Sequence, residues 1–186
     1  MNPTTWNMML FPMWAAWRGD TGRAEREYRA FSLDTNRKTR VEVSMPRAWI
    51  DSREGRWERV PELLAADAWI GINGGGWWGS LNLRRWLVAE AYERMGRLDS
   101  AAAFFKTITN PTNSNWGQAD SRGLVHSFAL RRLALLEDKL GQADSARVHW
   151  EQFMDTFTRP DSAFRHLVDE ARRKARSGLV GSRKSS

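Results

Sequence analysis

The sequence predicts an all-α protein, arranged as an α-solenoid of about four helix pairs with a further helix that closes the C-terminal end. The main observation is a repeat, in which a glycine is followed five residues later by a small or branched apolar residue and nine residues later by a large apolar one. The glycines are spaced by roughly 40 residues, a period typical of stacked helix pairs. Apolar residues also recur at helical spacing on either side of these glycines. The four sets are Gly19, Ala24 and Tyr28; Gly55, Val60 and Leu64; Gly96, Ala101 and Phe105; and Gly141, Ala146 and Trp150.

Length and composition are those of a soluble globular protein that forms one ordinary domain or one short repeat array. The chain has 186 residues, of which 41% are hydrophobic and 27% are charged. It contains no Cys, which excludes disulfides and thiolate metal sites. We expect a single domain over residues 1–176, followed by a flexible basic tail over residues 177–186.

The net charge of +7 is concentrated at the C-terminal end of the chain. Residues 171–186 contain six basic side chains and no acidic one, so the rest of the chain is close to neutral. A basic terminus of this kind is usually a solvated end, and specific nucleic-acid binding is not expected. The six residues are Arg172, Arg173, Lys174, Arg176, Arg183 and Lys184.

The most apolar stretch, Trp6–Trp17, contains Pro12 and is too short to cross a bilayer, which needs about 20 residues. It also lacks the basic segment and cleavage site of a signal peptide, so we expect a core helix there and no membrane insertion. The predicted location is the cytoplasm. An extracytoplasmic part of a membrane-anchored parent protein is the alternative.

The first two units of the repeat are the weaker ones. They are expected at about residues 5–31 and 44–67, each formed by two helices around its glycine. Pro46 lies near the start of its predicted helix, where proline is tolerated. Residues 34–43 are polar and then briefly strand-like, so we expect a connector there. The predicted helices are 6–18 and 21–31, then 46–53 and 57–67.

The third and fourth units, at about residues 83–109 and 127–157, have clearer helical patterns. Each glycine is expected to end the first helix in the left-handed conformation. Asp99–Ser100 and Asp144–Ser145 are expected to supply N-cap oxygens for the second helix. The predicted helices are 83–95, 100–109, 127–140 and 145–157, with a closing helix at 161–176 and loop insertions at 71–80 and 110–123.

These units resemble the tetratricopeptide repeat, in which a small residue and an aromatic residue in the first helix precede the turn glycine, an early alanine in the second helix and a final proline. The first two units depart from the pattern, because Asp51 replaces the aromatic residue and Val60 replaces the alanine. The C-terminal part is similar to the tetratricopeptide regions of bacterial regulatory and signalling proteins. The matching residues are Ala89, Tyr92, Gly96, Ala101, Phe105 and Pro111 in the third unit, and Leu133, Ala134, Gly141, Ala146, Trp150, Phe153 and Pro160 in the fourth.

The resemblance implies a right-handed superhelix whose first helices line a concave groove. The expected function is a non-catalytic scaffold that binds a peptide or partner domain in this groove. The alternative is a sensory or oligomerising C-terminal region of a larger bacterial signalling protein (a kinase or a transcriptional regulator), with self-association. A packing role is the competing interpretation for Trp6, Met9 and Met13, which also map to the groove. The expected partner-binding residues are Trp17, Trp49, Arg53, Trp86, Glu90, Arg94, Arg131 and Lys139.

The sequence offers little support for chemistry. His126, His149 and His166 lie far apart and have no neighbours at a metal-ligand spacing. The glycine-rich segment 71–79 lacks the Lys and Ser/Thr of a phosphate-binding loop, and no G-x-S-x-G motif is present. We therefore expect no catalytic, cofactor or metal site. A small helical enzyme or a nucleic-acid binder is the third alternative.

Overall fold

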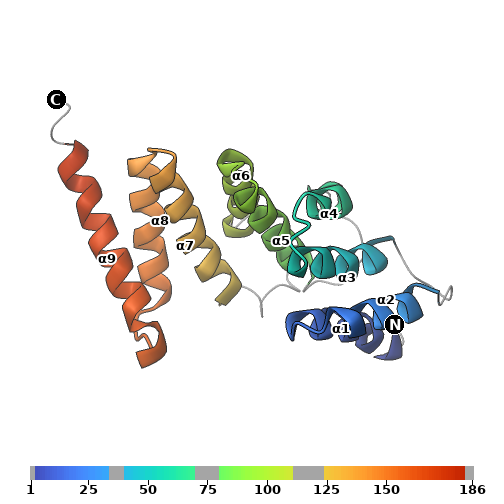
Figure 1. Cartoon of the computed structure of the whole chain (residues 1–186). Helices are drawn as coiled ribbons and strands as arrows, with labels where there is room; N and C mark the ends of the chain where they lie inside the picture. Colours follow the sequence, from blue (N-terminus) through green and yellow to red (C-terminus); the bar gives the residue numbers. More distant parts are fainter. Residues whose placement is uncertain (1–2, 34–39, 70–79, 111–123, 183–186) are drawn as a thin grey trace.

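The computed structural model describes residues 3–33, 40–69, 80–110 and 124–182, and these residues form α-helices with no β-strand among them (Figure 1). The all-α prediction is thus confirmed for the described part of the chain. The helices are α1 (Pro3–Trp17), α2 (Thr21–Leu33), α3 (Arg40–Arg53), α4 (Arg59–Trp69), α5 (Ser80–Arg94), α6 (Leu98–Thr109), α7 (Leu124–Lys139), α8 (Ala143–Thr156) and α9 (Ser162–Ser182).

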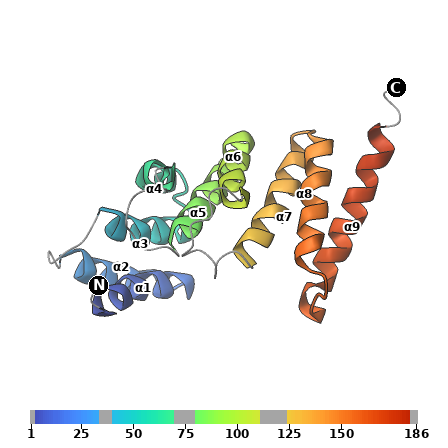
Figure 2. The ribbon, with the colours of Figure 1, turned by 180° about the vertical axis from the view of Figure 1, so that it is seen from behind.

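The helices follow one another along an elongated row, with α1 and α2 at one end and α9 at the other (Figures 1 and 2). Helices joined by a short glycine turn pack against each other: α1 with α2, α3 with α4, α5 with α6, and α7 with α8. Neighbouring hairpins then meet through α1 and α3, α4 and α5, and α6 and α7, and α9 packs on α8. The two hairpins with the clearest repeat pattern are therefore in contact.

The four repeat glycines form the same backbone turn. Their φ angles are positive, at 81°, 79°, 74° and 74° along the chain, a conformation that side chains other than glycine adopt at a cost. At Gly141 the amide N–H donates to the carbonyl of Asp138, and the next amide, of Gln142, donates to the carbonyl of Glu137. This pair of bonds is the Schellman arrangement that ends a helix. The corresponding pair of bonds is present at Gly19, Gly55 and Gly96.

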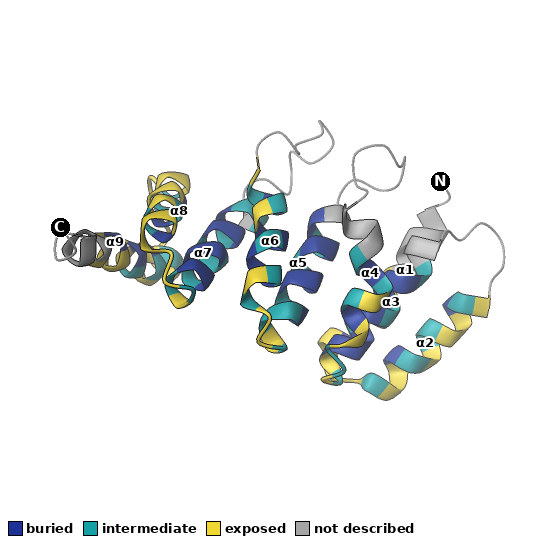
Figure 3. Ribbon diagram, turned by 90° about the horizontal axis from the view of Figure 1, so that it is seen from above, coloured by how far each residue is buried: buried dark blue, intermediate teal, exposed yellow. Residues whose placement is uncertain are grey.

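The apolar positions of the repeat form the contacts between helices. The small or branched residue after each glycine is buried, which lets the second helix of each pair approach its neighbour closely. The large residue four positions later is fully buried in three of the pairs, as Leu64, Phe105 and Trp150, and partly buried as Tyr28 in the first. Figure 3 shows buried residues over much of α5 and α7 and exposed residues on α2 and α8.

The core consists of neighbouring clusters along the row. The largest extends from Met13 on α1 to Leu136 on α7. A second joins α7, α8 and α9 around Trp150, and a third joins α1, α2 and α3 around Ile50. Helix α7 takes part in two of them, because Leu133 belongs to the large cluster and Leu130 to the cluster with α8.

Two predicted segments differ from the helices of the structure. Helix α3 begins at Arg40, so residues 40–43 of the predicted connector are helical and Pro46 lies inside the helix rather than near its start. Met45 and Ala48 are buried in the core, and this packing holds the segment helical around the proline. Helix α9 continues to Ser182, so residues 177–182 of the predicted flexible tail are helical. No proline interrupts this segment, and the Ser177 hydroxyl donates to the carbonyl of Lys174 one turn earlier.

The predicted N-caps of α6 and α8 are also wrong. These helices begin at Leu98 and Ala143, and the residues before them make no side-chain capping bond. Asp99 and Asp144 lie in the first helical turn instead, where a negative charge is favoured by the helix dipole. A capping aspartate is found at α2, where Asp20 Oδ1 accepts the amide N–H of Arg23 at 2.9 Å.

The two predicted loop insertions, residues 71–80 and 110–123, lie almost wholly outside the described residues.

Among the described helices, none is long and apolar enough to cross a membrane.

Candidate partner-binding surface

Helix α1 exposes a stripe of large apolar side chains that no described helix covers. The exposed fractions are 38% for Leu10, 49% for Phe11, 48% for Trp14 and 59% for Trp17. We call these four residues the α1 stripe. The spacing of Leu10, Trp14 and Trp17 places their side chains along one side of the helix, with Phe11 beside them. Contiguous apolar patches of this kind often mark interaction sites.

The buried residues of α1 explain why the stripe stays open. Met13, Ala15 and Ala16 are buried against α2 and α3 in the two N-terminal clusters. Because α1 is apolar on nearly every side, burying one side in the row leaves a second apolar side facing outward.

Two arginines border the α1 stripe at Trp14. The guanidinium carbons of Arg18 and Arg23 lie 5.6 and 5.4 Å from the centre of the indole ring. Such contacts between a cation and an aromatic face are attractive. Asp20 fixes the backbone of Arg23 through its capping bond, and Glu27 makes an exposed ion pair with the Arg23 side chain at 3.4 Å. The surface therefore combines an aromatic centre with a basic edge.

The N-terminal residues of the predicted groove differ in how far they are buried. Trp17 belongs to the exposed stripe, whereas Met13 is in the core, as the packing interpretation expects. The side chains of Trp6 and Met9 lie outside those that the structure describes. Trp49 is half-buried between two core clusters, and the exposed Arg53 lies 6.0 Å above its ring.

The middle of the predicted groove is partly occupied by packing. Trp86 is half-buried and meets the ring of Phe105 edge-on, with ring centres 5.2 Å apart. Arg94 is exposed and lies 5.4 Å from the ring centre of Trp57 on the preceding hairpin. Glu90 is within ion-pair distance of Arg94, at 3.8 Å. Glu90 and Arg94 are therefore neighbours on α5.

The two predicted residues on α7 connect helices of the row. Arg131 donates two hydrogen bonds to Glu170 on α9, from Nε at 3.1 Å and from Nη2 at 2.5 Å. Lys139 lies 3.2 Å from Glu93 on α5, and the other oxygen of Glu93 accepts from Arg132 at 2.6 Å. The structure gives both predicted residues a role in joining helices.

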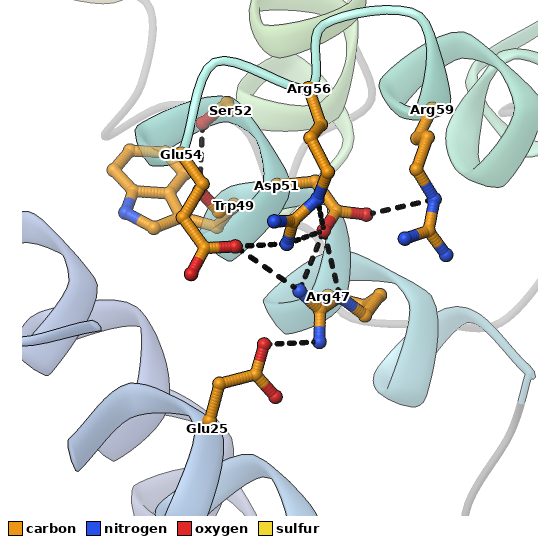
Figure 4. A network of polar contacts seen from close by, with 8 residues as sticks. All are labelled: Glu25, Arg47, Trp49, Asp51, Ser52, Glu54, Arg56 and Arg59. Carbon is orange, nitrogen blue, oxygen red and sulfur yellow. Dashed lines mark hydrogen bonds and ion pairs between the residues drawn. The ribbon is translucent and has the colours of Figure 1, made fainter. Parts of the chain in front are cut away.

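Asp51, which departs from the repeat pattern of the sequence, is a buried carboxylate that connects parts of the second hairpin (Figure 4). The Oδ1 atom of Asp51, a fully buried residue, accepts hydrogen bonds from Arg47 one helical turn earlier and from Arg56 in the turn that follows α3. Arg59, at the start of α4, lies 3.5 Å from the Oδ2 atom. Asp51 therefore joins α3, the glycine turn and α4.

Arg47 extends this network to the first hairpin. Its Nη1 atom donates to Glu25 on α2 at 2.7 Å, and its guanidinium carbon lies 5.3 Å from the ring centre of Tyr28. Burial disfavours the charged form of Arg47, but its hydrogen bonds to Asp51 and Glu25 outweigh this and raise its pKa. The same surroundings raise the pKa of Tyr28, mainly by burial and secondarily through the negative charges of Asp51 and Glu25, although Arg47 opposes this.

A second buried carboxylate joins α6, α7 and α8. Glu137 is fully buried, and its Oε2 atom lies 2.6 Å from Nδ1 of His149. Its Oε1 atom lies 3.4 Å from Nζ of Lys106. His149 thus takes part in packing between helices. Among the described residues, no three His, Asp or Glu side chains are placed to share a metal ion.

Sequence reasoning missed Leu10, Phe11 and Trp14 as surface residues. The available signal was the apolar character of Trp6–Trp17, which has more apolar residues than one buried side of a helix can hold.

Comparisons of the chain with protein-family models, with curated proteins and with solved structures gave no match.

Proposed function

We propose that the chain is a non-catalytic scaffold of the tetratricopeptide type, a solenoid of four helix pairs with a closing helix, which binds another protein. Two structural features support the repeat interpretation. The same glycine turn occurs in each hairpin, and the buried small residue follows it at the same distance each time. The contacts between successive hairpins give each unit a neighbour on which to bury its apolar side.

The observation that carries the proposed function is the exposed α1 stripe. Trp and Arg are enriched among the residues that dominate protein–protein binding, and here Trp14 and Trp17 lie beside Arg18 and Arg23. Exposing large aromatic side chains to water is unfavourable by about 25 cal/mol for each Å² of apolar surface. A partner protein that covers the stripe would recover this free energy.

The predicted groove contributes less than the sequence suggests. Arg131 and Lys139 are engaged with Glu170 and Glu93, so their charges are already balanced within the row. Arg53 is exposed on α3, and Arg94 is exposed on α5 with Glu90 at 3.8 Å, so both are accessible to a partner that extends from the α1 stripe along the row. We therefore place the main contact at Trp17, which is the most exposed residue of the α1 stripe.

Site-specific photo-crosslinking tests the proposed function. A photoreactive phenylalanine analogue replaces Trp17 in one variant and Val148, an exposed apolar residue on α8, in a matched control. In cells that make the protein, we expect a crosslinked protein band from position 17 that is absent or much weaker from position 148. Equal crosslinking at the two positions, or none at position 17, would contradict docking at the α1 stripe.

A further inference from the structure

The chemistry of the α1 stripe indicates what kind of segment it binds. We propose that it binds one amphipathic helix of a partner protein, whose apolar side is bordered by Asp and Glu side chains. This inference rests on the proposed function and adds the conformation and the charge of the bound segment.

The backbone of α1 favours a helical occupant over an extended one. In the middle of α1 the backbone N–H and C=O groups bond within the helix, apart from the one carbonyl whose partner would be the N–H that Pro12 lacks, so the stripe offers mainly side chains. An extended peptide laid on it would bury backbone polar groups that find no partner there, and such burial is costly. A helix satisfies its own backbone and presents apolar side chains at the same spacing as Leu10, Trp14 and Trp17.

The dimensions of the stripe agree with this mode. From Leu10 to Trp17 the stripe spans two helical turns, or about 10 Å at 1.5 Å for each residue. A partner helix lying along it would place apolar side chains between those of the stripe, as helices do when the ridges of one fit the grooves of another. The aromatic side chains supply the larger part of the contact area.

The two arginines at the edge of the α1 stripe determine which charge a bound helix should carry. Arg18 and Arg23 both lie within 6 Å of the centre of the Trp14 ring, so any helix seated on Trp14 approaches two guanidinium groups. Covering them with apolar surface alone would remove water from the charges without replacement, which is unfavourable. Carboxylates on the flanks of the partner helix would pair with them and also exclude basic helices.

The same edge disfavours a second copy of this chain as the occupant. In a symmetric pairing of two α1 helices centred on Trp14, both copies of Arg18 and Arg23 would gather around the symmetry axis. Like charges brought together at an interface oppose association. Within each copy Glu27 pairs with Arg23, so among the described residues Arg18 carries the unbalanced charge of this edge.

Synthetic peptides test the inference on the full chain. Two peptides of about 18 residues share one apolar helical side, and the flanking positions are Glu in the first and Lys in the second. A third peptide has the composition of the first in an order that destroys the apolar side. By isothermal titration calorimetry we expect the Glu peptide to bind at least about tenfold more tightly than the Lys peptide, and the reordered peptide not to bind.

Variants of exposed residues identify the binding surface. Trp17→Ser should weaken binding of the Glu peptide by about thirtyfold, while Val148→Ser should leave it unchanged. The double variant Arg18→Glu/Arg23→Glu should reverse the preference, so that the Lys peptide binds better. A reversal of this kind requires direct charge pairing, since a merely destabilised protein would lose both peptides together. Circular dichroism of each variant checks that the helices are retained.

The possible results of these experiments separate an error in the inferred occupant from an error in the proposed function. Equal binding of the Glu and Lys peptides overturns the acidic flank, and failure of both to bind overturns the helical occupant. A dimer in sedimentation equilibrium that Trp17→Ser dissociates would make a second copy the occupant and also overturns the inference. If the peptides fail while crosslinking at position 17 persists in cells, only the class of partner is wrong; if that crosslinking is also absent, the proposed function is wrong.

Discussion

Arg47 donates two hydrogen bonds to a single oxygen of Asp51, from Nε at 3.0 Å and from Nη2 at 2.6 Å. Because Arg47 also bonds Glu25, this pair connects the first hairpin to the second. A buried ion pair of this kind gives little net stability compared with apolar packing, but loss of one partner leaves a charge that water cannot reach. We therefore expect substitutions of this pair to destabilise the N-terminal half.

Replacing Asp51 by Ala should lower the free energy of unfolding by about 1–3 kcal/mol, because the partly buried Arg47 would lose its main acceptor and keep Glu25 as its remaining hydrogen-bond partner. Urea denaturation followed by circular dichroism measures this loss. The matched control is Asp169→Ala on α9, since Asp169 forms an exposed pair with Arg172 at 2.7 Å. The control should change stability by less than about 0.5 kcal/mol. Equal losses in the two variants would contradict a structural role for the Asp51 network.

Tyr28 gives a prediction for alkaline pH. Its pKa in the folded protein is raised above the ordinary tyrosine value of 10.0, chiefly by burial. The stabilising contribution of neutral Tyr28 is therefore complete below that value and is lost as the pH rises through the higher folded pKa. The free energy of unfolding should fall less steeply with alkaline pH in Tyr28→Phe than in the parent chain. Tyrosinate absorbance of the folded chain, compared with that of Tyr28→Phe, should locate the late-titrating group; an ordinary titration of Tyr28 would refute the burial argument.

The helix-ending turn can be tested by a pair of glycine substitutions with opposite expected signs. Gly141→Ala should destabilise the chain by about 1–2 kcal/mol, because alanine disfavours positive φ. A Cβ atom there would meet no atom within 4 Å, so the cost is conformational and not steric. Gly22→Ala lies inside α2 and should stabilise by roughly 0.5 kcal/mol. Thermal unfolding of both variants provides the measurement, and the same sign for both would be inconsistent with the turn.

Ala146 tests the close approach of helices in the last hairpin. It is buried at the start of α8, so Ala146→Leu should cost about 1–3 kcal/mol through overpacking. Ala143 is exposed three residues earlier on the same helix, and Ala143→Leu should stay within about 0.5 kcal/mol of the parent. Chemical denaturation of the two variants compares them directly. A tolerated leucine at position 146 would show that the buried small residue is not needed for packing.

Arg131 separates a structural role from a binding role in the predicted groove. Because it pairs with Glu170 in a partly buried position, Arg131→Ala should lower stability by about 1–2 kcal/mol. A double-mutant cycle with Glu170→Ala should give a coupling energy of about 1 kcal/mol. Arg94→Ala, at an exposed position on α5, should leave stability within about 0.5 kcal/mol of the parent. A coupling energy near zero would return Arg131 to the list of residues available to a partner.

The local features of the hairpins could be predicted from the sequence because they depend on neighbours in the chain. A glycine followed at fixed distances by Ala146 and Trp150 contains both the turn and the buried side of the next helix. The capping prediction failed because Asp99 and Asp144 suit the first turn of a helix as well as the N-cap, and the helices begin before them.

The features that depend on distant contacts could not be predicted in this way. Asp51 breaks the repeat pattern, and its partners Arg47 and Arg56 are close to it in the sequence. The bond from Arg47 to Glu25, which is 22 residues away and connects this network to the first hairpin, is visible only in the structure. Arg131 and Glu170 are 39 residues apart, so the sequence alone does not pair them. The α1 stripe is a related case, since periodicity identifies an apolar helix but does not tell which of its sides the row will bury.

Oxidative footprinting by mass spectrometry tests the central claim most directly, with the unsubstituted chain alone and in its purified complex with the partner that the crosslinking identifies. In the free chain Trp14 and Trp17 should be oxidised readily, while the fully buried Trp150 is protected. In the complex we expect Trp14 and Trp17 to become protected and Val148 to react as before. Unchanged oxidation of Trp14 and Trp17 in the complex would show that the partner binds elsewhere and would contradict the α1 stripe as the docking surface.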